Sequence, residues 1–289
     1  MKKPRHLSPG DTVAIVSLSA GTLGEPWAIH KLDIARRRLE EDYGLKVRVM
    51  PNALKGRDYL YRHPEARAAD LMDAFRDPEI RGVFNAIGGE DTIRLLPYID
   101  FDVLARDPKI FTGFSDTTSN HLMLYKAGVM SYYGASVMTN FSEYVRVNDY
   151  TAAMIRDTLF CPKPTLDIPS APYWYDDEDE KIWWDEKNMN TLKPYHPEEI
   201  GYEVVQGGGT VEGELLGGCL DVFIEVMGTS IWPTKEQWRV HGSNPVHINL
   251  NVRKKLDKVL MGGKFAQQTV VNPTAFQKCY HLITQMQLP

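Results

Sequence analysis

Residues 109–127, KIFTGFSDTTSNHLMLYKA, decide the fold because they join a strand to a helix through one tight turn. The apolar run at 109–112 is typical of a buried strand, and the helix that follows extends to Ala127. A serine at such a turn stands above the edge of a sheet, beside the free N–H groups and the positive end of the helix dipole. Ser115 is therefore a candidate nucleophile, although the spacing taken alone favours Ser115 or Asp116 as a simple helix cap.

A second strand, at residues 82–87, ends directly in Gly88-Gly89-Glu90-Asp91. The carboxyl ends of parallel strands meet at one edge of a sheet, where ligands bind, and glycine lets the backbone approach a ligand closely. The N–H groups of Gly89 and Asp116 would then form a two-donor oxyanion hole, and Asp91 would cap the next short helix. An ordinary glycine turn fits the same residues. Phosphate binding is disfavoured, because the chain has no Gly-Lys-Ser/Thr and no complete GxGxxG.

Strand and helix signals alternate through residues 1–130. We expect helices that begin near Pro26, Pro64 and Thr117, between strands at 12–16, 45–49, 82–87 and 109–112. Such alternation implies right-handed crossovers and a parallel sheet that is covered by helices on both faces. The sequence therefore predicts an α/β fold, with an N-terminal nucleophile domain over residues 1–160.

The chain changes character after this domain. Residues 162–200 are rich in proline, aromatic residues and acids and have no regular period, so we expect 161–206 to form a linker and a long aromatic, acidic loop. A glycine-rich run then begins a second unit, residues 207–289. Residues 239–289 contain seven Lys or Arg and one acid, whereas the preceding part of the chain carries a net charge of −11. Such a break is typical of a domain boundary, a binding tail or a tail of different origin.

Composition excludes several classes of protein. The net charge of −5 argues against a nucleic acid polymer as partner, and no run approaches the roughly 18 apolar residues that a membrane helix needs. Cys161, Cys219 and Cys279 are far apart and odd in number, so a disulfide framework and a cysteine zinc site are not expected. A reducing cytoplasm fits best. No residues have metal-ligand spacing, and we expect neither a metal nor a cofactor.

Four segments, in this order, resemble the LD-carboxypeptidase family of serine peptidases: VAIVSLS at 13–19, IGGED at 87–91, GFSDTT at 113–118 and LGGCL at 216–220. The acidic, tryptophan-rich insert and the GGCL sequence resemble the microcin C immunity branch of that family. The resemblance implies an N-terminal flavodoxin-like domain, a smaller β-rich C-terminal domain, an active site between them and a homodimer.

The resemblance also implies a chemistry. It makes Ser115 the nucleophile of a Ser-His-Glu triad that cleaves amide bonds by acyl transfer. One group of the family removes the terminal D-alanine from murein tetrapeptide, and the immunity group cuts the amide that joins an amino acid or peptide to a nucleotide-like moiety. Trp183 and Trp184 are then candidates to stack on a nucleobase, and Glu90 is a candidate substrate contact. The alternative for the tryptophans is that one of them packs the loop onto the body of the protein.

Beyond Trp238 the family's catalytic Glu and His cannot be placed. The family's histidine follows a glycine, and residues 239–289 contain no Gly-His, only His241, His247 and His281. This point coincides with the charge break, which favours an aberrant or misjoined end. We therefore expect an incomplete C-terminal domain and little activity of the chain as written. The alternative function is a non-catalytic binding protein that keeps the family's pocket.

Two further interpretations compete with this one. His121 follows Ser115 by six residues, which is about 600° along a helix and so roughly the opposite face. We therefore expect His121 to be structural rather than the catalytic base. A class I amidotransferase-like or nucleotide-binding domain would need a reactive cysteine at the turn or a phosphate loop, and the sequence has neither.

Overall fold

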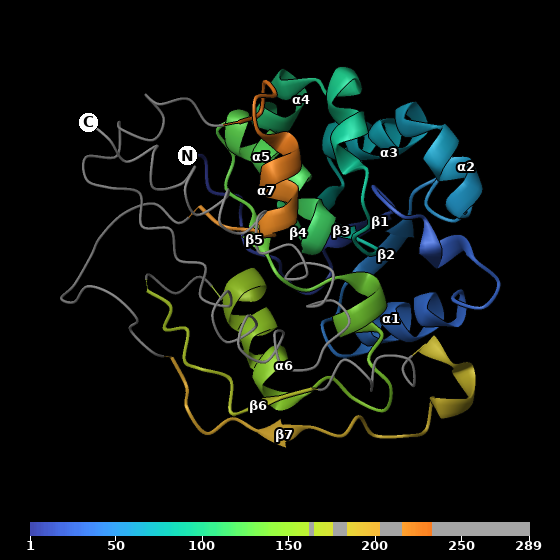
Figure 1. The fold of residues 1–289 in the computed structure, drawn as a ribbon, viewed down its shortest axis with the longest axis vertical. Helices are drawn as coiled ribbons and strands as arrows, with labels where there is room; N and C mark the ends of the chain where they lie inside the picture. The colour runs from blue at the N-terminus through green and yellow to red at the C-terminus, as the bar shows by residue number, and fades with distance from the viewer. Residues whose placement is uncertain (162–164, 176–183, 203–215, 233–289) are drawn as a thin grey trace.

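The computed structural model describes residues 1–161, 165–175, 184–202 and 216–232. Its centre is a five-stranded parallel sheet in the order β2-β1-β3-β4-β5 (Figure 1). This is the strand order of flavodoxin-like folds, so the predicted N-terminal α/β fold is confirmed. The strands are β1 (Thr12–Val16), β2 (Lys46–Val49), β3 (Ile80–Asn85), β4 (Ile110–Gly113) and β5 (Tyr132–Tyr133).

Helices cover both faces of this sheet (Figure 1). One face carries α3, α4, α5 and α7, and the other carries α1 and α6. The α2 helix (Arg57–Arg62) leads into α3. The bounds of the others are α1 (His30–Glu41), α3 (Pro64–Arg76), α4 (Phe101–Arg106), α5 (Thr118–Lys126), α6 (Asp149–Ile155) and α7 (Leu220–Val226).

The central strands are apolar on both sides, as expected of a doubly covered parallel sheet. In β1, Val13 and Ile15 face the α1 side, whereas Ala14 and Val16 face the α3 side. All four side chains are fully buried. The β1, β3 and β4 strands therefore form a rigid platform, and the turns at their carboxyl ends share one edge.

The predicted helix boundaries hold in part. Pro64 is the first residue of α3, as expected. Pro26 instead lies in the turns before α1, which begins at His30. Gly44 follows α1 with φ 65°, a left-handed conformation that suits glycine after a helix end.

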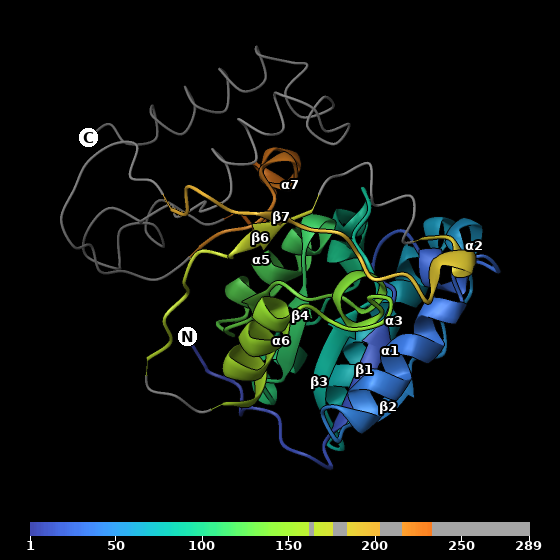
Figure 2. The same ribbon diagram turned by 90° about the horizontal axis from the view of Figure 1, so that it is seen from below.

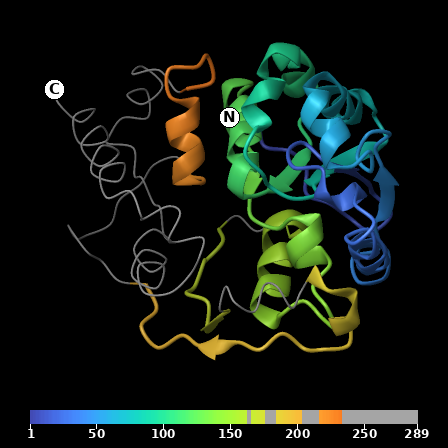
Figure 3. The same ribbon diagram turned by 45° about the vertical axis from the view of Figure 1, so that its right-hand side comes forward.

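The linker segment runs along the α6 side of the molecule (Figures 2 and 3). It contains a two-stranded antiparallel sheet of β6 (Tyr173–Trp174) and β7 (His196–Pro197). The Tyr173 hydroxyl accepts a hydrogen bond from the Tyr150 N–H at 3.0 Å, which ties β6 to α6. A segment of the predicted long loop is therefore docked on the N-terminal domain.

The predicted β-rich C-terminal domain lies mostly outside the described residues. Within 207–289 the structure describes 216–232, which contain α7. Val222 and Val226 of this helix are buried against the α5 side of the core. In the described ranges, no helix has both the length and the apolar character needed to cross a bilayer.

Candidate active site

Ser115 lies at the turn between β4 and α5, at the carboxyl edge of the sheet. Its backbone has φ 60°, a left-handed conformation that residues other than glycine seldom adopt. The Ser115 N–H donates to the Tyr133 hydroxyl at 2.9 Å, and the Ser115 carbonyl accepts from the Thr118 hydroxyl at 2.7 Å. A strained, half-buried serine between a strand and a helix is the geometry of a nucleophile elbow.

Gly88 packs directly against this elbow. A β-carbon at Gly88 would lie 2.8 Å from the Ser115 Cβ, closer than real β-carbons approach, and 3.0 Å from its Oγ. Gly113 is constrained in the same way, because a β-carbon there would lie 2.7 Å from Thr117 Cγ2. The two glycine-containing turns singled out in the sequence therefore meet, and glycine is what allows them to meet.

The predicted oxyanion-hole donors lie on these two turns. A β-carbon at Gly88 would lie 3.2 Å from the Asp116 nitrogen, so the two turns meet there as well as at Ser115. Gly89 rests on the turn after β1, where a β-carbon would lie 2.1 Å from Ser19 Oγ. Within the described ranges, the N–H groups of Gly89 and Asp116 have no hydrogen-bond acceptor. Both groups therefore remain candidates for binding a ligand at the elbow.

The Asp116 side chain has a second part in the site. Its buried carboxylate accepts four hydrogen bonds on Oδ2: from Ser19 Oγ at 2.5 Å, from the N–H groups of Asp91 and Thr92 at 2.9 Å each, and from Thr92 Oγ1 at 2.7 Å. Asp116 therefore satisfies the N–H groups at the start of the 3-10 helix Thr92–Tyr98. The prediction that Asp91 caps this helix is wrong, because Asp91 makes no side-chain capping bond there.

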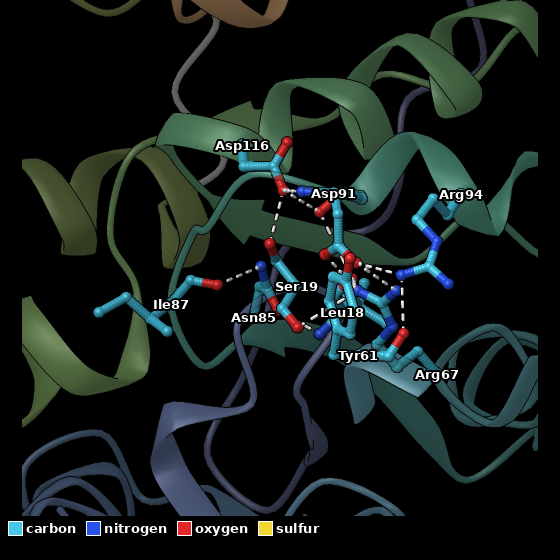
Figure 4. Close-up of polar contacts among 10 residues, drawn as sticks. Leu18, Ser19, Tyr61, Arg67, Asn85, Ile87, Asp91, Arg94 and Asp116 are labelled. Atoms are coloured by element: carbon cyan, nitrogen blue, oxygen red, sulfur yellow. Dashed lines mark hydrogen bonds and ion pairs between the residues drawn. The ribbon is translucent and has the colours of Figure 1, made fainter. Parts of the chain in front are cut away.

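Asp91 instead pairs with Arg67, which is 0% exposed on α3 (Figure 4). Arg67 Nη1 and Nη2 donate to the two Asp91 carboxylate oxygens at 2.8 and 3.0 Å. Nη1 also donates to the carbonyls of Leu18 and Ser19, each at 3.2 Å. One buried guanidinium thus joins the turns after β1 and β3, and the sequence analysis did not identify it.

Asn85, the last residue of β3, joins the same turns. Its Oδ1 accepts from the N–H group of Leu18 at 3.1 Å (Figure 4). It also accepts from the N–H group of Ala86 at 3.1 Å. Its Nδ2 donates to the Ile87 carbonyl at 3.1 Å and to Thr117 Oγ1 at 2.7 Å. All the capacity of this buried amide is used, so the β3 turn and the elbow are held in one position.

The predicted substrate-binding residues are only partly in view. Glu90 is exposed on the Gly88-Gly89 turn. Trp184 packs edge-on against Trp27, with ring centroids 5.9 Å apart, and lies 5.6 Å from the Lys31 ammonium. These contacts fit the alternative in which one tryptophan packs the loop onto the protein body. Trp183 lies outside the described residues.

His121 has the structural role predicted for it. Its Nε2 donates to the Gly113 carbonyl at 3.0 Å, and its Nδ1 accepts from Ser131 Oγ at 2.7 Å. Both ring nitrogens are thus engaged in the neutral form of the ring. Burial lowers the pKa of His121 to about 4, so this ring is a poor proton acceptor near neutral pH.

The buried His121 makes stability depend on pH. Because its pKa falls from 6.5 when unfolded to about 4 when folded, the unfolded chain binds the proton first as the pH falls. We expect the free energy of unfolding to drop by roughly 3 kcal/mol between pH 6.5 and pH 4 through this group. Urea unfolding at a series of pH values should show a shallower acid loss in His121→Gln. Parallel curves for the wild type and His121→Gln would contradict the assignment.

The Gly-Gly-Cys-Leu segment also reaches the elbow. The Cys219 N–H donates to Thr118 Oγ1 at 2.9 Å, and a β-carbon at Gly218 would lie 2.5 Å from Thr118 Cγ2. Residues 218–219 therefore pack on the first turn of α5, next to the serine. One of the four family-like segments, 113–118, contains the elbow, and each of the other three contacts it, through Ser19, Gly88 and residues 218–219.

A histidine base hydrogen-bonded to Ser115 is not found in the part of the chain that the structure describes. No histidine there hydrogen-bonds to Ser115; these residues are His6, His30, His63, His121 and His196. His241, His247 and His281 lie outside the described residues. The described ranges likewise hold no cluster of side chains suited to a metal ion.

Known proteins are similar to this chain in sequence. A model of the LD-carboxypeptidase N-terminal domain matches residues 13–134. A protein of Vibrio cholerae whose name places it among the carboxypeptidases is 31% identical over 232 residues, which are 79% of this chain and 66% of that protein. A probable murein peptide carboxypeptidase of Bacillus subtilis is 29% identical over 279 residues, which are 96% of this chain and 76% of that protein.

Solved structures agree with the sequence matches. An MccF-like protein of Streptococcus pneumoniae in complex with AMP superposes with a TM-score of 0.71 at 34% identity, covering 79% of this chain and 70% of that one. The microcin C7 self-immunity protein MccF in complex with aspartyl sulfamoyl adenosine gives a TM-score of 0.68 at 26% identity, covering 80% and 67%. The chain thus spans about two thirds of the length of the Vibrio relative and of these solved proteins. Fold, motifs and matches together show that the chain belongs to the LD-carboxypeptidase family.

Proposed function

We propose that the protein is a serine-type hydrolase in which Ser115 attacks an amide bond of a murein LD-peptide or of a peptidyl- or aminoacyl-nucleotide. The observation that carries this proposal is the left-handed backbone of Ser115 at the end of β4, pressed against Gly88. A serine that only caps a helix needs no such conformation, because capping residues ordinarily adopt extended backbone angles. The strain raises the hydroxyl above the sheet edge, where ligands bind in α/β folds.

The proposed reaction is acyl transfer in two steps. A base takes the Ser115 proton, Oγ bonds to the amide carbonyl carbon, and the N–H groups of Gly89 and Asp116 stabilise the negative oxygen. The carbon–nitrogen bond then breaks, and the amine leaves with a proton. Water attacks the resulting ester and releases the acid. The positions of Gly89 and Asp116 beside the elbow support this assignment of donors.

The relatives support two substrate classes. The name of the Bacillus protein points to murein peptides, whereas the pneumococcal and MccF complexes contain AMP and an aminoacyl-sulfamoyl nucleoside. We propose that Trp183 and Trp184 contact the nucleobase of a nucleotide-like substrate and that Glu90 contacts the substrate at the elbow. Trp184 lies half-buried at the edge of the protein body, next to the exposed Trp27.

Ligand binding tests this proposal without relying on turnover. In a Ser115→Ala background we expect both aspartyl sulfamoyl adenosine and murein tetrapeptide to give measurable isothermal titration signals. Adding Trp184→Ala should weaken binding of the nucleoside by about 10-fold or more, because stacking on an aromatic ring contributes roughly 1–3 kcal/mol per base. Binding of the peptide should change by less than about 3-fold.

The matched control is Trp174→Ala, which removes a tryptophan that stacks on His196 in the β6–β7 sheet. It should leave both affinities unchanged. Equal losses for the two ligands in Trp184→Ala would count against base stacking. Failure of the Ser115→Ala protein to bind either ligand would refute the proposed function.

A second candidate function is binding without hydrolysis. It is favoured by one observation: within the described ranges no histidine hydrogen-bonds to Ser115. Such a protein would bind the nucleoside or the peptide and release it intact. Product analysis in the same ligand mixtures separates this function from slow hydrolysis.

We further propose that the protein works in the cytoplasm as a homodimer. Cys161 forms no disulfide with another described residue, which suits a reducing compartment, and the family resemblance implies the dimer. The proposed reaction uses hydroxyl, amide and proton-transfer chemistry alone.

A further inference from the structure

The Asp116 carboxylate is bound by two turns that come from other strands (Figure 4). Ser19 follows β1, and Asp91 and Thr92 follow β3, yet all of them donate to the same Asp116 oxygen, Oδ2. Asp116 is 1% exposed, and its Oδ1 accepts no hydrogen bond from the described residues. The side chain is therefore a clamp: it connects the two turns to the elbow through hydrogen bonds to one buried oxygen, Oδ2.

Ser19 links this clamp to Gly89. The Ser19 hydroxyl that donates to Asp116 is also the atom nearest to a β-carbon built on Gly89, at 2.1 Å. The neighbouring Ala20 N–H donates to the Gly88 carbonyl at 3.3 Å. The Gly88-Gly89 turn thus packs on Ser19, which donates to Asp116. The residues that follow this turn, Asp91 and Thr92, donate their N–H groups to the same carboxylate.

We infer that the Asp116 carboxylate is a positioning residue of the oxyanion hole, which sets the place of the Gly89 N–H relative to the N–H of Asp116 itself. The inference rests on the proposed function, since it assigns these two N–H groups as donors. Such donors are effective only when they are fixed at about 2.7–3.1 Å from the developing oxyanion. Two consecutive glycines have wide conformational freedom, so this turn needs an external restraint. One residue thereby supplies one donor with its main chain and fixes the other with its side chain.

The first test measures the turn itself and needs no catalysis. Backbone ¹⁵N relaxation on the full chain should give order parameters of about 0.85 for Gly88 and Gly89 in the wild type, as is typical of rigid backbone. In Asp116→Asn they should fall below about 0.6, while β3 and α5 stay rigid. Asp100→Asn is the matched control, because Asp100 accepts the Asp102 and Val103 N–H groups at the start of α4, away from the elbow.

The second test measures the hole through Ser115. An activated ester at alkaline pH should acylate Ser115 in the wild type. Asp116→Asn should lower the acylation rate constant at saturating ester by about 100-fold, as loss of one donor does. The ester concentration that gives half of the maximal rate should be nearly unchanged. If the substitution only lowered the fraction of folded protein, the amount of acylated protein would fall, but the rate constant and the half-saturating ester concentration would not change. Ser19→Ala keeps Asp116 and removes one of the four hydrogen bonds that its carboxylate accepts, so it should lower the acylation rate constant by about 10-fold. This variant replaces Asp116→Asn in the test if Asp116→Asn does not fold.

The outcomes separate the two claims. A rigid Gly88-Gly89 turn in Asp116→Asn and Ser19→Ala, or an unchanged acylation rate in both, would overturn the positioning role. Absence of Ser115 acylation in the wild type would overturn the proposed function instead, and the relaxation data would still decide whether Asp116 holds the turn.

Discussion

Purified as the 289-residue chain, the protein is expected to hydrolyse murein tetrapeptide and aspartyl sulfamoyl adenosine far more slowly than ordinary enzymes do. A serine hydroxyl without a base is a weak nucleophile near neutral pH. Loss of triad members typically leaves only the roughly 10³ to 10⁴-fold advantage over water that an oxyanion hole and substrate binding provide. We therefore expect a turnover number below about 10⁻² s⁻¹, against about 10 s⁻¹ for a typical enzyme.

The physical basis of this prediction is the protonation chemistry around Ser115. His121 is close in sequence, but both its nitrogens are engaged and burial lowers its pKa to about 4. No other described histidine hydrogen-bonds to the serine. Product formation should be followed by liquid chromatography, beside Ser115→Ala. Ser115-dependent turnover of either substrate at about 1 s⁻¹ or more would refute the prediction.

Asp91→Ala is expected to produce the largest loss of stability at the sheet edge. The substitution leaves the Arg67 guanidinium, which is 0% exposed, without its bidentate partner. Removing one member of a buried ion pair costs about 3–5 kcal/mol, because the remaining charge stays buried and uncompensated. The main-chain N–H of Asp91 still donates to Asp116, so the effect reports on the carboxylate alone.

Arg94→Ala is the matched control for this change. Arg94 also donates to Asp91, at 3.0 Å, but its side chain is 39% exposed. An exposed pair contributes at most about 1 kcal/mol, so the control should be close to the wild type. Urea unfolding followed by circular dichroism measures all three proteins. Similar losses in Asp91→Ala and Arg94→Ala would contradict a dominant role for the buried pair.

The sequence predicts the scaffold well because periodicity and turn residues are local signals. Apolar runs that end in Gly88-Gly89 and at Gly113 mark the carboxyl ends of two strands that are neighbours in the sheet. Parallel topology then places both turns at one edge, without knowledge of any side-chain contact. The positive φ of Ser115 follows from the same turn, although the sequence gives no direct measure of it.

The network beneath the site is not predictable in this way. Arg67 sits on the apolar face of α3, and Asn85 interrupts an otherwise apolar strand, so each is visible as a polar residue in a buried pattern. Their hydrogen-bond partners lie on turns that follow other strands, and a local sequence pattern does not specify which turns pack beside them. The prediction that Asp91 caps the helix was wrong for that reason. Asp116, which is distant in sequence, accepts the hydrogen bond from the Thr92 N–H group, and the Asp91 carboxylate pairs with Arg67.

The most direct test of the account is to map where an activated acyl group attaches to the protein. The wild-type chain and Ser115→Ala are treated with the 4-nitrophenyl ester of an N-acylated amino acid over a range of alkaline pH, and acylated peptides are identified by mass spectrometry. We expect an acyl group on Ser115 whose rate of formation rises with pH, because hydroxide in solution deprotonates the serine hydroxyl. Acylation confined to lysines, with Ser115 unmodified at every pH, would contradict it.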